Sequence, residues 1–136
     1  MLAPLSRLAP ATEALIRLVA GLSLVAHGTP KVFGGMAEAA AFLDEAGFAP
    51  PYPLAVLVAA TEFGGGLALA FGLLTRAAAF AAMIFLIVAI SYHWQFGFYW
   101  NEVGYEYPLF WSIVCLHFVV RGGGPYSLDR LLGREL

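Results

Sequence analysis

The chain has 136 residues, of which 61% are hydrophobic and only 12% are Asp, Glu, Lys or Arg. Soluble domains carry about 25% charged residues, so this composition excludes an ordinary soluble surface and predicts a membrane protein with one domain, residues 1–136. The net charge of -2, without a basic cluster, argues against a nucleic-acid partner.

Four apolar stretches predict the spans of an all-α, integral membrane four-helix bundle that contacts membrane lipids. Their approximate ranges are 12–33, 53–74, 77–98 and 105–121. A helix needs roughly 20 residues to cross the ~30 Å hydrocarbon core. The second and third stretches meet this length, whereas the fourth is short. Pro30 either ends or kinks the first helix.

The segments between the spans carry local signals. Residues 36–47 predict a short interfacial helix at the membrane surface between the first and second spans. Gly72 predicts a tight turn, with Thr75 as the N-cap of the third helix. Pro108 suits the first turn of the fourth helix, which the glycines of residues 122–124 end.

Basic residues gather on one predicted side of the membrane. Four spans place the N-terminus, the turn at 72–76 and the C-terminus together, with Arg7, Arg76, Arg121, Arg130 and Arg134 and, close by, Arg17. The opposite side has Lys31 and the carboxylates Glu38, Asp44, Glu45, Glu102 and Glu106. Because basic loops stay in the cytoplasm, we expect a multi-pass protein of the inner (plasma) membrane with cytoplasmic N- and C-termini.

Ionisable groups inside the spans define one layer. At 1.5 Å per residue from the inner edge, Glu62 lies about 21 Å up, Glu106 and His27 about 22 Å and His93 about 25 Å. Lys31 lies one turn above His27. Charged groups in a bilayer are costly and usually functional, so this layer predicts a polar site in the outer half of the bundle. Alternatively, His93, Lys31 and Glu106 are interfacial residues that face water.

Small residues indicate where helices approach one another. Arg17, Gly21, Gly28 and Lys31 share one stripe of the first helix, which is expected to face the bundle, although Arg17 could instead snorkel to the surface. The glycines at 64–66 either hold the second helix close to a partner near Glu62 or serve packing alone.

Aromatic residues crowd the outer ends of the third and fourth helices. They form either an aromatic belt at the membrane interface or a wall for a planar ligand such as a quinone, beside His93 and Glu106. The residues are Tyr92, Trp94, Phe96, Phe98, Tyr99, Trp100, Tyr105, Tyr107 and Trp111. The single cysteine, Cys115, lies in an apolar run and is expected to pack.

Several motifs, taken together, resemble the DoxX family of small membrane proteins. The matching pieces are Arg17 and the segments 28–34, 60–66, 71–76, 100–101, 105–108 and 126–129. The resemblance implies a four-helix membrane fold. Some members belong to a thiosulfate:quinone oxidoreductase, and others associate with membrane-bound thiol-redox assemblies. This chain lacks a cysteine pair, which argues against an autonomous thiol mechanism but leaves a quinone-facing or partner-anchoring role.

The leading hypothesis is a redox-associated membrane subunit that binds a quinone or anchors a redox protein partner. Glu62, His93 and Glu106 are expected to handle protons as catalytic residues, because reduction of a quinone to a quinol takes up two protons. The expected cofactor-binding residues are His27, Lys31, Trp100, Asn101 and Tyr105.

Other functions fit the same residues. The polar layer could fix the bundle of a membrane scaffold that has no chemistry. It could also relay protons in a small-molecule or proton transporter, which would act as a homo-oligomer because four helices make a thin wall for a pore. No Glu-x-x-His spacing supports a metal site within the bundle.

Overall fold

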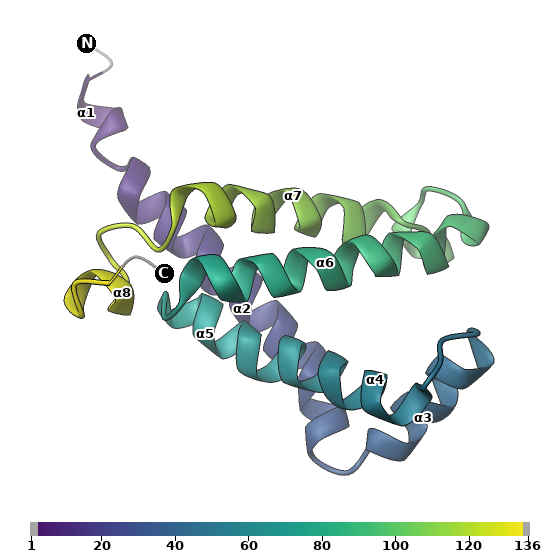
Figure 1. Ribbon diagram of the computed structural model, residues 1–136. Helices are drawn as coiled ribbons and strands as arrows, with labels where there is room; N and C mark the ends of the chain where they lie inside the picture. The colour runs from purple at the N-terminus through teal and green to yellow at the C-terminus, as the bar shows by residue number, and fades with distance from the viewer. Residues whose placement is uncertain (1–2, 135–136) are drawn as a thin grey trace.

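The computed structural model describes residues 3–134, and within this range it is helical, without strands (Figure 1). Three helices of the described range are long and apolar enough to cross a membrane: Pro4–Val32, Pro51–Phe71 and Thr75–Phe96. The fourth predicted span forms α7 (Glu106–Arg121), which has only 16 residues. The all-α class is confirmed for the described residues; residues 1–2 and 135–136 of the predicted domain lie outside them.

The first span follows the short helix α1 (Ala3–Ser6) and is α2 (Ala9–Val32). Pro30 lies inside α2, so it does not end this helix. The short helix predicted between the first and second spans is α3 (Met36–Glu45). It is followed by the turn that leads the chain into the second span.

The second span is divided into three helical segments. It begins as α4 (Pro51–Ala59), continues as a π-helix over Ala60–Gly65, and ends as α5 (Gly66–Phe71). Gly72 closes α5 in the left-handed conformation at φ 69°, which confirms the predicted tight turn.

The third span is α6 (Thr75–His93), extended by a 3₁₀ turn over Trp94–Phe96. A second 3₁₀ turn, Trp100–Glu102, precedes α7, and α8 (Leu128–Leu131) follows it. Pro108 is in the first turn of α7 and Gly122 ends that helix, as predicted.

The prediction that Thr75 is the N-cap of the third helix is wrong. Leu74 occupies the cap position in a left-handed conformation, and Thr75 is the first helical residue. The carboxylate of Asp129 accepts hydrogen bonds from Leu74 N (2.7 Å), Thr75 N (2.8 Å) and the Thr75 hydroxyl (2.6 Å). The helix start is therefore capped by a side chain from the C-terminal segment rather than by its own residue.

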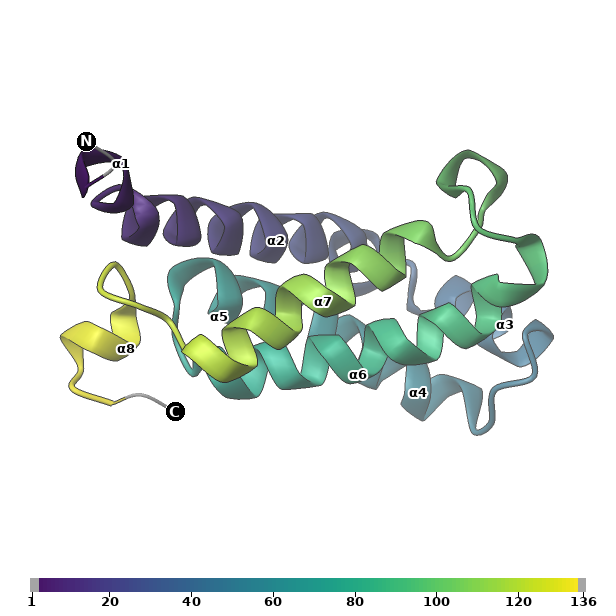
Figure 2. The ribbon, with the colours of Figure 1, turned by 90° about the horizontal axis from the view of Figure 1, so that it is seen from above.

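The helices run between two ends of the molecule (Figure 2). The first helical turns, the turn between α5 and α6, and α8 lie at one end, which agrees with the predicted grouping. Helix α3 and the loop between α6 and α7 lie at the other, which we call the α3 end. Helix α6 packs along α7, and α2 crosses the π-helix and α5. The shared core contains Leu69, Ala79, Phe118 and the fully buried Cys115, whose packing role is confirmed.

The crossing of α2 over α5 depends on glycine. A Cβ on Gly66 would lie 2.8 Å from Gly21 O and 2.9 Å from both Leu24 Cβ and Val25 N. These distances are too short for a carbon contact, so the two backbones meet only because Gly66 has no side chain. Gly64, in contrast, has nothing within 4 Å of its Cβ position, so this glycine has no role in the contact.

We expect Gly66→Ala to lower the free energy of unfolding by about 1–3 kcal/mol, because α2 has to move away from α5. The matched variant Gly64→Ala should be neutral or stabilising by up to ~1 kcal/mol, because alanine favours helix and meets no neighbour. Denaturant titration of both purified variants measures the difference. Equal stability of the two variants would contradict this account of the crossing.

Candidate functional site

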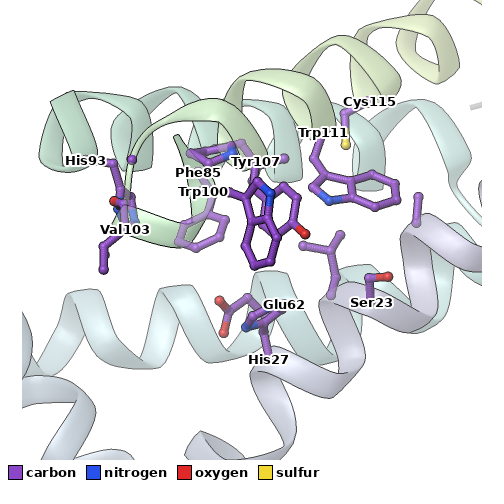
Figure 3. A pocket seen from close by; sticks show the side chains of 15 residues that line it. Ser23, His27, Glu62, Phe85, His93, Trp100, Val103, Tyr107, Trp111 and Cys115 are labelled. Atoms are coloured by element: carbon purple, nitrogen blue, oxygen red, sulfur yellow. Dashed lines mark hydrogen bonds between the residues drawn. The ribbon is translucent and has the colours of Figure 1, made fainter. Parts of the chain in front are cut away.

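A cavity of about 390 Å³ lies among α2, the π-helix, α6 and α7 (Figure 3). We call it the first cavity. Its walls are mainly apolar, and its polar side chains include those of Ser23, His27, Glu62 and His93. Figure 3 shows Trp100 and Tyr107 on the opposite side of the cavity from Glu62 and His27. The cavity therefore combines a flat aromatic surface with ionisable groups, which suits a planar ligand that carries polar atoms.

Glu62 is a buried carboxylate in the wall of this cavity, with 5% of the residue exposed. Its Oε2 lies 2.6 Å from Lys31 Nζ. The same ammonium group donates to the backbone carbonyl of His27 at 2.9 Å. Buried charges are expected to be paired, and this ion pair compensates the charge of the carboxylate.

The backbone around Glu62 is irregular. Glu62 lies in the π-helix, which adds a residue to the turn; such turns are rare and are frequently found at functional sites. On the facing helix, a Cβ on Gly28 would lie 2.6 Å from Phe63 N and 2.9 Å from Glu62 Cβ. The absence of a side chain at Gly28 thus lets α2 approach the turn that carries Glu62, and Lys31 follows one turn later.

His93, at the end of α6, is held by the loop that precedes α7. Its Nδ1 lies 2.6 Å from the carbonyl oxygen of Val103. Because a carbonyl oxygen can only accept, Nδ1 must carry the proton in this bond. In a neutral ring, Nε2 then has a lone pair that can accept a proton or a hydrogen bond.

The structure brings together some of the predicted site residues and separates others. His27, Glu62, His93 and Trp100 line the first cavity, and Lys31 reaches it through Glu62. The other three predicted residues, Glu106, Asn101 and Tyr105, do not line it.

These three residues belong to the loop and helix start behind the cavity wall. Glu106 accepts a hydrogen bond from the backbone N–H of Trp100 at 3.1 Å, so it holds a residue that lines the cavity. Tyr105 stacks on Trp94 with ring centroids 4.7 Å apart, and Asn101 is exposed. Equal depth along the helices did not guarantee that each side chain points inward.

Tyr107 and Trp111 belong to the aromatic wall that the sequence analysis offered as an alternative, whereas Ser23, Phe85 and Cys115 were not predicted to line a site. Tyr107, Trp111 and Cys115 line the cavity from α7, and Ser23 lines it one turn before His27. Both sets are spaced by four residues, which places side chains on one face of a helix. This spacing was the available signal. Phe85, which also lines the cavity, gave no signal within its uniformly apolar run.

A second buried polar cluster joins the C-terminal segment to the bundle at the end opposite the α3 end. Arg17 is 3% exposed, and its guanidinium donates to the carbonyls of Gly123 and Tyr126, the latter at 2.7 Å. The alternative that Arg17 snorkels to the surface is therefore wrong. The stripe of Arg17, Gly21 and Gly28 is buried, as predicted.

His117, near the same end, is exposed and lies 3.8 Å from a carboxylate oxygen of Glu13.

Within residues 3–134 the structure shows no group of three or more His, Cys, Asp or Glu side chains that could hold a metal ion.

Comparison with known proteins identifies related chains. Residues 13–97 match the model of the family described as DoxX. The chain is also similar to the inner membrane protein YqjF of Escherichia coli (strain K12), with 40% identity over 84 residues. The matched part covers 61% of this chain and 62% of that relative, so this chain spans less than two-thirds of its length. No solved structure matches.

Proposed function

Because this chain belongs to the DoxX family of membrane proteins, we propose that it binds a quinone in the first cavity and serves a redox reaction in the membrane. The observation that carries this proposal is the arrangement of Trp100 and Tyr107 opposite the buried, lysine-paired carboxylate of Glu62. The matched family region, residues 13–97, includes Glu62, Lys31 and both cavity histidines.

The chemistry of a quinone fits these walls. Its ring is flat and apolar, and aromatic side chains such as Trp100, Tyr107 and Trp111 favour stacked or edge contacts with such rings. Its two oxygens need a few fixed polar partners. Ligand sites with volumes of ~300–1,000 Å³ typically supply such a small number of polar groups within apolar walls. The volume of about 390 Å³ is enough for a ring but lies near the lower end of that range.

Reduction of a quinone to a quinol consumes two electrons and two protons. Since the single cysteine cannot form a dithiol, we assign the electrons to a redox protein partner. Glu62 and His93 Nε2 are the acceptors for the hydroxyl groups of a quinol, and they exchange its protons. Lys31 and His27 set the charge around Glu62. Glu106 acts indirectly, since it holds Trp100.

Asn101 and Tyr105 keep a supporting role in the same proposal. Tyr105 stacks on Trp94 at the end of α6, and Asn101 lies in the 3₁₀ turn that carries Trp100. The turn and the stacked pair together place the loop over the cavity. Substitutions at these two positions should therefore affect ligand affinity less than substitutions at Glu62 or His93.

In the membrane, we propose that α7 is the fourth span of a four-helix bundle. Its 16 residues extend about 24 Å at 1.5 Å per residue, which is shorter than the hydrocarbon core. The exposed rings of Tyr99, Trp100 and Tyr107 extend the span into the interface. The basic end, with α8, lies in the cytoplasm, and the α3 end faces the opposite side of the inner membrane.

Ligand titration tests the site. Quenching of tryptophan fluorescence by a quinone analogue, and separately by its quinol form, gives the two dissociation constants for protein in lipid nanodiscs. We expect Glu62→Gln to weaken quinol binding by roughly 10–100-fold, because a charge-assisted hydrogen bond of about 1.5–3 kcal/mol is lost, and to change quinone binding less. His93→Ala should also weaken quinol binding.

The matched control is Glu102→Gln, since Glu102 is exposed in the loop before α7 and does not line the first cavity. It should bind both forms as the wild type does. If Glu62→Gln and His93→Ala also bind the quinol with wild-type affinity, the site is assigned to the wrong residues.

A further inference from the structure

A second cavity lies on the other side of Glu62. It is bounded by α3, the end of α2 and α4, and its volume of about 390 Å³ equals that of the first cavity. Lys31, Ala39, Leu43 and Val58 are among its lining residues. Glu62 and Phe85 line both cavities, so these two side chains form the partition between them.

The ion pair between Lys31 and Glu62 lies on the side of the second cavity. Lys31 lines the second cavity but not the first, and its side chain is 25% exposed, whereas that of Glu62 is 6% exposed. The carboxylate is therefore held by a group that reaches solvent at the α3 end. Glu62 thus lines a space at the α3 end whose walls include none of the aromatic residues Trp100, Tyr107 and Trp111 of the first cavity.

We propose that the second cavity is the route by which protons reach Glu62 from the α3 end, and that Glu62 delivers them into the first cavity. In each cycle the Glu62 carboxylate takes one proton from a hydronium ion in the second cavity, which leaves a water molecule there, and becomes a neutral carboxyl group. It then releases that proton to a basic atom in the first cavity and returns to the carboxylate. Lys31 keeps its charge, and no electron moves in this step.

Other titratable groups surround Glu62. Those that line the two cavities are His27 and Lys31 from α2, Glu38 from α3, His93 from α6, and Tyr107 and Cys115 from α7, whereas α4 and α5 supply none to either lining. Glu38 is exposed and lines only the second cavity, so it can exchange protons with water at the mouth of the route.

Helix α3 forms the outer wall of this route. Phe42 of α3 meets Tyr92 of α6 edge to face, with ring centroids 5.3 Å apart, and this contact holds α3 over the cavity. Ala39 is half-buried and lines the cavity from the same helix, whereas Ala41 is exposed and lines neither cavity. A large side chain at position 39 would fill the route, and the same side chain at position 41 would not.

The test follows the Glu62 carboxyl group by ¹³C NMR, in full-length protein labelled on glutamate carboxyl carbons in lipid nanodiscs without quinone. Glu62→Gln identifies the resonance. In the wild type, fast proton exchange should give one averaged resonance throughout the pH titration. In Ala39→Phe the exchange should become slow, so that two resonances coexist near the midpoint. Leu43→Trp, which fills the same cavity, should behave likewise, and unchanged signals of the other glutamates verify folding.

Two controls decide the outcome. Ala41→Phe changes neither cavity, and Ser23→Phe fills the first cavity. Both variants should keep the single averaged resonance. The route is overturned if Ala39→Phe and Leu43→Trp also keep it, if Ser23→Phe splits it, or if the wild type already shows two resonances. The inference rests on the proposed function only for the identity of the proton acceptor. If the protein does not bind quinone but the NMR results are as expected, the proposed quinone function is wrong and the proton route still holds.

Discussion

Replacement of Lys31 by methionine should lower the free energy of unfolding by about 3–5 kcal/mol, because it removes the partner of a buried carboxylate. Glu62 Oε2 lies only 2.6 Å from Lys31 Nζ, and the Glu62 side chain is 6% exposed. Without the ammonium group, the folded state has to hold either an uncompensated charge or a carboxyl group that has taken up a proton. Both forms are less favourable than the paired carboxylate.

The cost should be largely relieved by a second substitution. Lys31→Met combined with Glu62→Gln has no buried charge, so we expect its stability to lie within about 1–2 kcal/mol of the wild type. Denaturant unfolding of the wild type, both single variants and the double variant gives the coupling energy. Additive single effects would mean that the two side chains do not stabilise each other.

A matched control for this pair is available at the surface. Arg121→Met breaks an ion pair with Glu13, in which the nitrogen–oxygen distance is 3.3 Å and the Arg121 side chain is 62% exposed. Exposed pairs contribute about 0–1 kcal/mol, so this variant should remain close to the wild type. A loss as large as that of Lys31→Met would show that burial is not the cause.

The second large effect is expected at Asp129, which holds the C-terminal segment against the start of α6. Asp129→Asn should lower the free energy of unfolding by about 2–4 kcal/mol, because its carboxylate accepts three hydrogen bonds in a buried position and the amide NH₂ cannot accept. The backbone N–H groups of Leu74 and Thr75 then compete for one oxygen. The segment of α8 should also become accessible to trypsin.

Thermal unfolding and limited digestion measure the two consequences of Asp129→Asn. Asp44→Asn serves as the control, since Asp44 is an exposed carboxylate on α3, far along the chain from this cluster. It should leave both the unfolding temperature and the digestion pattern unchanged. Wild-type stability of Asp129→Asn would mean that another group caps α6.

The depth of the polar layer followed from the sequence because helix geometry fixes it. A rise of 1.5 Å per residue places Glu62, His27 and His93 at similar heights once the spans are known, and the structure brings all three to the first cavity. The direction of each side chain about the helix axis did not follow. Glu106 has the same depth, yet it binds the backbone of Trp100 behind the wall.

Contacts between distant segments were also beyond the sequence. Thr75 looked like a cap because its type and position fit the local pattern, but Asp129, 54 residues later, supplies the cap. The π-helix at Ala60–Gly65 replaces what the apolar pattern presents as an uninterrupted α-helix. No local pattern records such contacts, since their energy arises only after the segments have packed.

Hydropathy and helix geometry were enough to predict a helical membrane protein, the approximate ranges of its apolar helices, and the shared level of Glu62, His27 and His93. These properties depend on hydropathy, on turn residues such as Gly72 and Gly122, and on the fixed rise of a helix. The tertiary structure alone decided that Lys31 pairs with Glu62, that Glu62 separates two cavities, and that α7 turns aromatic rings toward it. Helix rotation and crossing are set by side-chain packing and by close approach at Gly28 and Gly66, which are properties of the assembled chain.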